Sequence, residues 1–286
     1  MKYIFMKEQS QNHCISKMAR VLKTSRSGYY KWLITPKSDR ELDNELLILK
    51  IKTYQEELKY TYGSKRLTVH IKNVEEIALG HNRVAKLMRE NNLGAKRKRQ
   101  WRKPKEEKDL KSTIPNILDR NFDVSEANKV WVSDISYIRT SSGWKYLCAI
   151  MDLYNRKIIG WSFAQRMDMP LVMNAFQAAI INRNNPKGVM FHTDRGSQYC
   201  SNEFKKVLKK NKFIQSMSRK GNCWDNACIE SFFKSLKYEY LYPMGIMTTQ
   251  ETKLNLFEYI EIFYNRKRIH TSLGNKSPEE YENKCA

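Results

Sequence analysis

The sequence predicts a mixed α/β domain, with one sheet flanked by helices, preceded by an all-α region that contains helix-turn-helix candidates. From residue 129 onward, short β-branched and aromatic runs alternate with helical patterns, whereas the residues before 112 show helical periodicity. The chain of 286 residues is 41% hydrophobic, which is enough for a core, yet its formal net charge is +22. This excess of Lys and Arg favours a polyanionic partner such as nucleic acid.

The N-terminal region predicts short helices separated by polar turns. Helices are expected at 15–22 and 28–33, around the turn KTSRS, and at 41–57. A second pair is expected at 64–74 and 81–91, with Arg83 and Lys86 facing away from its apolar contacts. Such a pair is either a helix-turn-helix that contacts DNA or a helical hairpin with a solvated basic face, and the pattern leaves both open.

A basic arm follows these helices. The segment AKRKRQWRKPK, residues 95–105, cannot bury itself, so we expect either an arm along a phosphate backbone or a flexible tether. The predicted division is an N-terminal helical region over 1–60, a helix-turn-helix with basic linker over 61–112, and the α/β part over 113–286. The first two parts together carry a net charge of +14 and the third +8. The candidate DNA contacts here are Arg83, Lys86, Arg97, Lys98, Arg99 and Arg102.

The sequence pattern of the third part, residues 113–286, predicts five strands. Three antiparallel strands are expected at 129–138, 144–153 and 157–163, and two more at 188–194 and 212–217. Helices are expected at 170–182, 202–210 and 226–241, the last of them capped by Asp225. One mixed sheet with helices on both faces fits this order.

Three carboxylates in this part are candidate catalytic or metal-binding residues. Asp134 lies in the middle of a strand, where a carboxylate is costly unless it binds a cation or accepts hydrogen bonds. Asp194 ends a strand, and Glu230 flanks the apolar stripe of the last helix. Lys234 and Lys237 follow Glu230 by one and two turns on the same flank and are candidate DNA contacts.

Acids that meet at a sheet edge of a basic protein suggest Mg²⁺ and phosphoryl transfer. Each acid also has an ordinary structural interpretation: a hydrogen-bonded strand residue for Asp134, a turn former for Asp194 and a surface helix residue for Glu230. His192 could orient a phosphate or end its strand as a hydrogen-bonded histidine. The basic cluster at 265–270 suits either DNA contact or core packing. The residue pattern alone leaves these alternatives open.

Longer strings in the sequence carry a family resemblance. Thirty-five residues separate Asp194 from Glu230, as in the DD(35)E signature, and the surrounding strings include WVSDISYI, MDLYNRKIIGW, HTDRGSQY and FYNRKRIHTSLGNKSPEEY. SRSGYYKW, YGSKRL and RVAKLMRENNL extend the likeness to the N-terminal part. Over nearly the whole chain, the sequence resembles the OrfB transposases of the bacterial IS-three-type insertion sequences.

The resemblance implies a ribonuclease-H-like integrase catalytic core with a C-terminal helical extension over 113–286. It assigns Asp134, Asp194 and Glu230 as ligands of two Mg²⁺ or Mn²⁺ ions. The implied reaction is DDE-type transposition: water cleaves a strand at the element's end, and the freed 3′-hydroxyl attacks a target phosphodiester in line. The implied partners are double-stranded DNA of the element ends and target, further copies of the chain on that DNA, and a protein from an upstream frame.

Two alternatives remain beside a transposase: a DNA-binding regulator with an inactive ribonuclease-H-like body, and a metal-dependent nuclease that cuts without joining. A recombinase with a tyrosine nucleophile would have to use Tyr264 beside the basic residues that follow it. The longest apolar runs are shorter than the roughly 18–20 residues that a membrane span needs, and no secretory signal is evident. A cytoplasmic, nucleoid-associated protein without a membrane partner is therefore expected.

Overall fold

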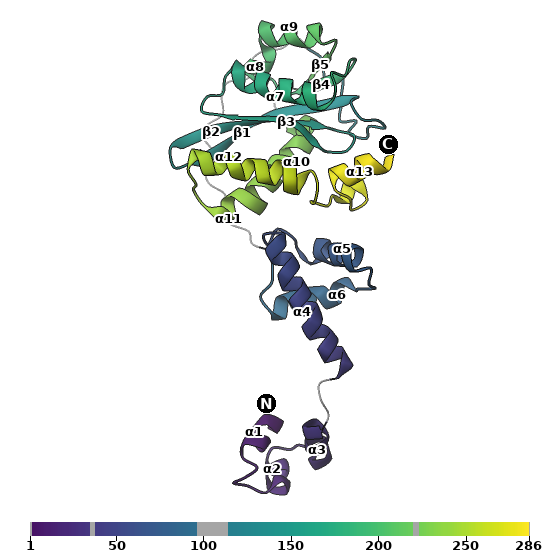
Figure 1. The fold of residues 1–286 in the computed structure, drawn as a ribbon, viewed down its shortest axis with the longest axis vertical. Coiled ribbons are helices and arrows are strands. Elements are labelled where there is room, and N and C mark those ends of the chain that lie inside the picture. Colours follow the sequence, from purple (N-terminus) through teal and green to yellow (C-terminus); the bar gives the residue numbers. More distant parts are fainter. Residues whose placement is uncertain (1, 35–37, 96–113, 220–222, 286) are drawn as a thin grey trace. The chain divides into compact units, whose positions relative to one another are not determined.

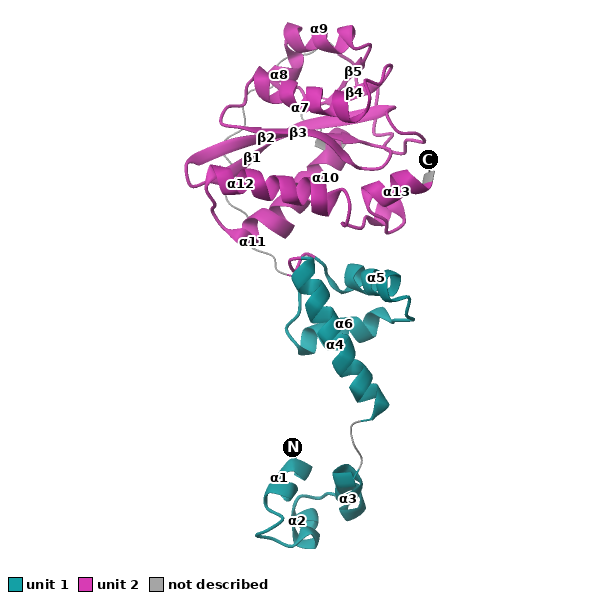
Figure 2. Ribbon diagram, in the orientation of Figure 1, with its two compact units in different colours: residues 1–58, 62–94 teal, residues 59–61, 95–286 magenta. Residues whose placement is uncertain are grey.

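The computed structural model describes residues 2–34, 38–95, 114–219 and 223–285. The chain divides into two compact units (Figure 2), one over 1–58 and 62–94 and the other over 59–61 and 95–286. The predicted boundaries after residues 60 and 112 stay predictions. Four of the candidate DNA contacts, Arg97, Lys98, Arg99 and Arg102, lie outside the described residues.

The first unit is helical, as the periodicity predicts. Its helices are α1 (Lys2–Glu8), α2 (Ile15–Val21), α3 (Arg26–Ile34), α4 (Asp39–Glu57), α5 (Ser64–Glu75) and α6 (His81–Glu90). Met6, Met18 and Tyr29 are buried together among the first three helices. Ser38 begins α4 with a capping box, in which its hydroxyl and the Glu41 carboxylate each accept from the other's backbone N–H.

The second unit is built on a five-stranded mixed sheet in the order β3-β2-β1-β4-β5. The strands are β1 (Val130–Thr140), β2 (Gly143–Asp152), β3 (Ile158–Ala164), β4 (Met190–Thr193) and β5 (Ile214–Met217). β1, β2 and β3 are antiparallel neighbours, while β4 runs parallel to both β1 and β5. The predicted mixed sheet is therefore confirmed, and β1 is its central strand.

Helices cover both faces of this sheet (Figure 1). One face packs against α7 (Met169–Asn182), α8 (Ser197–Cys200) and α9 (Asn202–Lys210), through buried side chains such as Phe176, Tyr199 and Phe204. The other packs against α10 (Ala227–Ser235) and the helices after it, through Phe232, Leu236 and Tyr259. Because Val132 and Ile138 belong to this second cluster, Asp134, which shares their face of β1, also faces α10.

The expected single helix over 226–241 is interrupted. A 3₁₀ turn, η1 (Cys223–Asn226), precedes α10, and a π-helical segment, η2 (Leu236–Leu241), continues it into α11 (Tyr242–Met244). Asn226 is the N-cap residue and makes no side-chain capping bond. The prediction that Asp225 caps this helix is therefore wrong, because its carboxylate is used by distant partners described below.

The C-terminal segment supports the edge of the sheet. It comprises α12 (Thr249–Phe257), the π-helical η3 (Glu258–Tyr264), the 3₁₀ turn η4 (Thr271–Leu273) and α13 (Pro278–Cys285). Asn265 is buried; its Oδ1 accepts from Ile158 N and its Nδ2 donates to Ile158 O, both at 2.9 Å. Arg268, only 3% exposed, donates to both carboxylate oxygens of Glu239. Of the two roles left open for this cluster, Asn265 and Arg268 serve core packing.

Candidate active site

Asp134 lies at the centre of the sheet, paired with Ala149 across β1 and β2. Its Oδ1 accepts a 2.7 Å hydrogen bond from the backbone N–H of Ile135. Burial raises the pKa of the Asp134 carboxyl well above its ordinary range, and the charges of Asp194 and Glu230 raise it further. The Ile135 N–H and the Lys237 ammonium act in the opposite direction. The three predicted acids thus lie within electrostatic reach of one another.

Asp194 and Glu230 approach this carboxylate from two other elements. Asp194 follows the last residue of β4, and its Oδ1 accepts from Gly196 N at 3.0 Å, which bends the chain into α8. Glu230 lies in the first turn of α10, the helix that contacts β1. Both side chains are exposed, in contrast to Asp134. The parallel strand β4 and the helix α10 therefore bring their acids toward the middle of β1, where the ladder between β1 and β4 ends.

The donor set suits a hard divalent cation, because Mg²⁺ prefers carboxylate oxygens and water. A cation near the three carboxylates would offset the repulsion that raises the pKa of Asp134. Within the described ranges, however, no group of three His, Cys, Asp or Glu side chains is gathered closely enough to hold a metal ion. Since Asp194 and Glu230 are exposed, a change of side-chain rotamer toward Asp134 would disturb no core packing.

Asp225, five residues before Glu230, has a role that the sequence did not reveal. Its fully buried carboxylate accepts from the backbone and guanidinium of Arg219, from Arg120 Nε at 2.9 Å and from Asn116 Nδ2 at 3.0 Å. The Arg219 guanidinium holds the pKa of this carboxyl far below its ordinary range. Asp225 is thereby bonded both to Arg219 and to Asn116 and Arg120, which lie near the start of the α/β unit. No local signal marks partners more than 100 residues apart.

His192 is a structural residue of β4. Its ring is fully buried, with Nδ1 2.9 Å from Ser216 Oγ and Nε2 3.1 Å from Ser218 Oγ. Ser216 Oγ already accepts from the N–H groups of Ile117 and Leu118, so its hydroxyl donates to Nδ1 and the ring proton is assigned to Nε2. Burial lowers the pKa of His192 to about 4. Of the two interpretations, the hydrogen-bonded strand-end histidine fits the structure.

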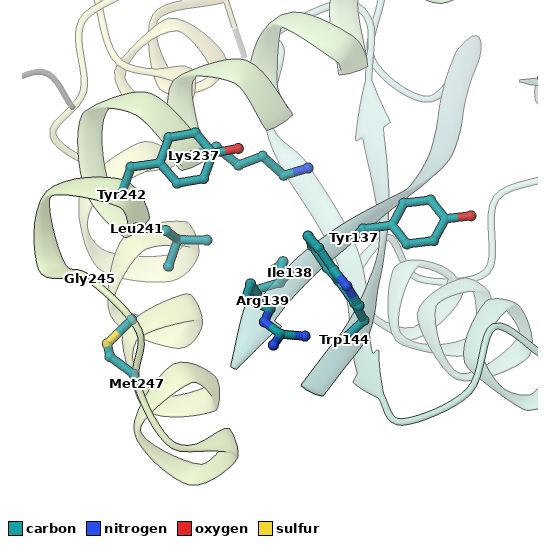
Figure 3. Close-up of a pocket in the computed structure, with 9 residues that line it drawn as sticks. All are labelled: Tyr137, Ile138, Arg139, Trp144, Lys237, Leu241, Tyr242, Gly245 and Met247. Carbon is teal, nitrogen blue, oxygen red and sulfur yellow. The ribbon is translucent and has the colours of Figure 1, made fainter. Parts of the chain in front are cut away.

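The two candidate lysines of the last helix have different surroundings. Lys234 is exposed, whereas Lys237 is only 8% exposed and donates to Ser136 Oγ at 2.6 Å. The wider π-helical turn that begins at Leu236 explains why residues three apart do not share one flank. Lys237 extends toward β1 and lines a pocket at the end of the β1–β2 hairpin (Figure 3), together with Tyr137, Ile138, Arg139, Trp144, Leu241, Tyr242, Gly245 and Met247.

The remaining candidate residues are readily placed. In the first unit, Arg83 is half-buried and donates from Nε to Asn44 Oδ1 at 2.8 Å, while Lys86 is exposed and lies 3.8 Å from the Glu90 carboxylate. Tyr264 is 2% exposed, and burial raises the pKa of its hydroxyl far above the ordinary range. Such a hydroxyl is unsuited to act as a nucleophile on DNA. No helix among the residues described is long and apolar enough to cross a membrane.

Known protein families match most of the chain. Residues 124–223 and 211–278 match two families described as integrase core domains, and residues 41–101 match the HTH-like domain. The five strands, Asp134 and Asp194 lie in the first match, whereas α10 with Glu230 lies in the second. The fold and the site therefore define an integrase-core protein with an HTH-like domain before the core.

Relatives that align over nearly the full length show which family of integrase-core proteins the chain belongs to. The chain is 37% identical over 289 residues to the transposase InsF for insertion sequence IS3A of Escherichia coli K12, with 99% of each chain covered. It is 39% identical over 267 residues to an uncharacterized 31 kDa protein of insertion element IS600 of Shigella sonnei, covering 93% of this chain and 98% of that one. The chain therefore belongs to the family of insertion-sequence IS3 transposases and is a transposase with an integrase core.

Solved structures of viral integrases are also similar. The intasome of simian T-cell lymphotropic virus in complex with the PP2A regulatory subunit B56 gamma aligns with a TM-score of 0.46 and 15% identity, covering 82% of this chain and 73% of that one. The HTLV-2 integrase catalytic core domain in complex with magnesium aligns with a TM-score of 0.39 and 15% identity, covering 54% and 95%.

Proposed function

We propose that Asp134, Asp194 and Glu230 are the catalytic residues of this transposase and that they hold two Mg²⁺ or Mn²⁺ ions. The observation that carries the proposal is the electrostatic interaction of the three carboxylates beside the last pair of the β1–β4 ladder, where burial and like charge oppose ionisation of Asp134. When bound, the ions would stabilise charge on the attacking and leaving oxygens of a phosphodiester.

The protein's own residues supply position and charge. The Ile135 N–H fixes one oxygen of Asp134, and the Lys237 ammonium, held by Ser136, favours its ionised form. Gly196 N fixes an oxygen of Asp194 in the same way. These contacts hold the carboxylates in position for a phosphate. Because no protein residue bonds covalently to DNA, cleavage and joining depend on placing water or a 3′-hydroxyl in line with the phosphodiester bond that breaks.

For DNA binding, we propose a division between the two units. In the core, Lys234 and Lys237 follow Glu230 along the helix and are proposed to contact the reacting DNA end. Arg83 and Lys86 of α6 are proposed to contact the element ends, with Arg97, Lys98, Arg99 and Arg102 along the phosphate backbone. A DNA substrate also supports the proposals of a homo-oligomer on DNA, an upstream-frame partner and a nucleoid location.

The test is strand transfer by purified Glu230→Gln protein with labelled element ends, target DNA and Mg²⁺. We expect joining to be lost while DNA binding is retained, because the substitution removes one carboxylate from an exposed position. Glu203→Gln is the matched control, since Glu203 is also an exposed acid in the first turn of a helix, α9. Joining by Glu230→Gln would refute the assignment, and cleavage without joining by the unmodified chain would indicate a nuclease.

A further inference from the structure

We propose that Ser133, Tyr199 and Asn226 are positioning residues that set the relative placement of the three acids, through contacts that converge on Ser133. The inference rests on the proposed function, because it concerns the carboxylates assigned there. Each of the three residues lies close in the chain to a different acid: Ser133 precedes Asp134 on β1, Tyr199 of α8 follows Asp194, and Asn226 precedes the helix α10 that carries Glu230.

The first contact joins the Asp194 segment to β1. Tyr199 lies in α8, immediately after the turn that Asp194 makes with Gly196, and its hydroxyl is 2.8 Å from Ser133 Oγ. Cys148 Sγ of β2 lies 3.6 Å from the same hydroxyl and 3.7 Å from Ser133 Oγ. All three side chains are at most 1% exposed. A buried network of this kind fixes distances, because moving any member would leave a polar group without a partner.

The second contact joins the Glu230 segment to the same residue. Asn226 is the N-cap of α10 and donates from Nδ2 to the carbonyl oxygen of Ser133 at 3.1 Å. Its Oδ1 is buried and has no hydrogen-bond partner in the part of the chain that the structure describes. An unsatisfied buried acceptor costs about 1–3 kcal/mol. The Asn226 side chain therefore reduces the stability of the fold through its unsatisfied oxygen while its nitrogen bonds to β1. This combination is expected of a side chain whose role is to position a neighbouring segment.

The location of Ser133 explains why the contacts converge there. Ser133 pairs with Thr193, the last residue of β4, so the ladder between β1 and β4 ends beside Asp134 and Asp194. Beyond that pair the backbone no longer holds the two segments together. Tyr199 and Asn226 continue the connection with side chains, and both contact Ser133, which immediately precedes Asp134. Removing a hydrogen-bond partner of a metal ligand typically changes metal affinity about 10–100-fold, and because these contacts act through the neighbour of Asp134 we expect the lower end of that range.

The test measures Mn²⁺ binding to the full-length chain by isothermal titration calorimetry, without DNA. We expect Tyr199→Phe and Asn226→Ala each to weaken Mn²⁺ binding about 10-fold or more, and to do so non-additively in the double variant because both act through Ser133. Tyr264→Phe is the matched control, a buried tyrosine in the other core cluster, and should bind Mn²⁺ as the unmodified chain does. Thermal melting confirms that each variant is folded.

Unchanged Mn²⁺ affinity in both folded variants would overturn the positioning role, as would an equal loss in Tyr264→Phe. A different result identifies failure of the proposed function itself. If Asp134→Asn bound Mn²⁺ as tightly as the unmodified chain, the three acids would not be the metal site, whatever the positioning variants did. Loss of affinity in Asp134→Asn together with loss in Tyr199→Phe and Asn226→Ala supports both.

Discussion

His192 makes the stability of the α/β unit depend on pH. Burial lowers its pKa to about 4 from the ordinary value of 6.5, and both ring nitrogens are already hydrogen bonded as a neutral ring. At pH values between these two, the histidine is protonated in the unfolded chain and neutral in the folded chain. Stability from the neutral histidine is therefore complete above the unfolded-state pKa and is lost as the pH falls toward 4.

The size of the effect follows from the two pKa values. At about 1.4 kcal/mol per pH unit, the interval from 6.5 to about 4 corresponds to about 3 kcal/mol of unfolding free energy. For a protein of this size, each kcal/mol shifts the melting temperature by about 2–4 °C. Half-buried Asp134 and buried Asp152 contribute with the opposite sign, because their pKa values are raised. The histidine must therefore be isolated by substitution.

Urea unfolding followed by tryptophan fluorescence, at several pH values from about 7 to about 4, measures this difference. His192→Gln should lose about 3 kcal/mol of pH dependence relative to the unmodified chain, even though it is less stable at neutral pH. His13→Gln is the control, because His13 is exposed, and it should keep the full dependence. If His192→Gln lost stability on acidification as steeply as the unmodified chain, the buried neutral histidine would not be the cause.

Three further predictions concern packing and charge. Gly160→Ala should destabilise by about 1–3 kcal/mol in thermal melts, because the added Cβ would lie 2.6 Å from a backbone nitrogen of α7; an unchanged melting temperature would contradict this packing. Arg268→Ala should cost about 3–5 kcal/mol in urea unfolding by removing the buried guanidinium that donates to both carboxylate oxygens of Glu239, and exposed Arg266→Ala should cost far less. In metal-free buffer, Asp134→Asn should stabilise by about 0.5–2 kcal/mol; a fall in melting temperature would mean that its charge is better compensated than its surroundings indicate.

Local patterns predicted the strands and the place of Asp134. Alternation along β1 places Val132 and Ile138 on the face of Asp134, and in the structure both belong to the core cluster that includes residues of α10. The short spacing of the turns likewise predicted the three antiparallel strands that open the sheet. Such features depend on residues close together in sequence, so the sequence alone was enough.

Long-range contacts could not be predicted in this way. The sequence suggested a helix cap for Asp225 because nothing near it announces Arg120 or Asn116. Lys234 and Lys237 were expected on one flank because the sequence pattern predicts an unbroken α-helix and does not reveal the π-helical turn that begins at Leu236. The amide of Asn226 is one of many in the sequence, and only the fold brings it to Ser133. These are tertiary effects that override local preference.

The pairing of Asn265 with Ile158 affects how the molecule tolerates truncation. β3 is an edge strand, and unpaired N–H and C=O groups on such a strand can recruit a strand from another chain. The Asn265 amide occupies both groups of Ile158 from within the same molecule. A protein truncated just after Tyr264 would keep Asp134, Asp194 and Glu230 but would leave the N–H and C=O groups of Ile158 without the Asn265 amide. We expect such a protein to be lost to aggregation, so that an element lacking the codons for residues 265–286 would be silenced through solubility rather than through chemistry.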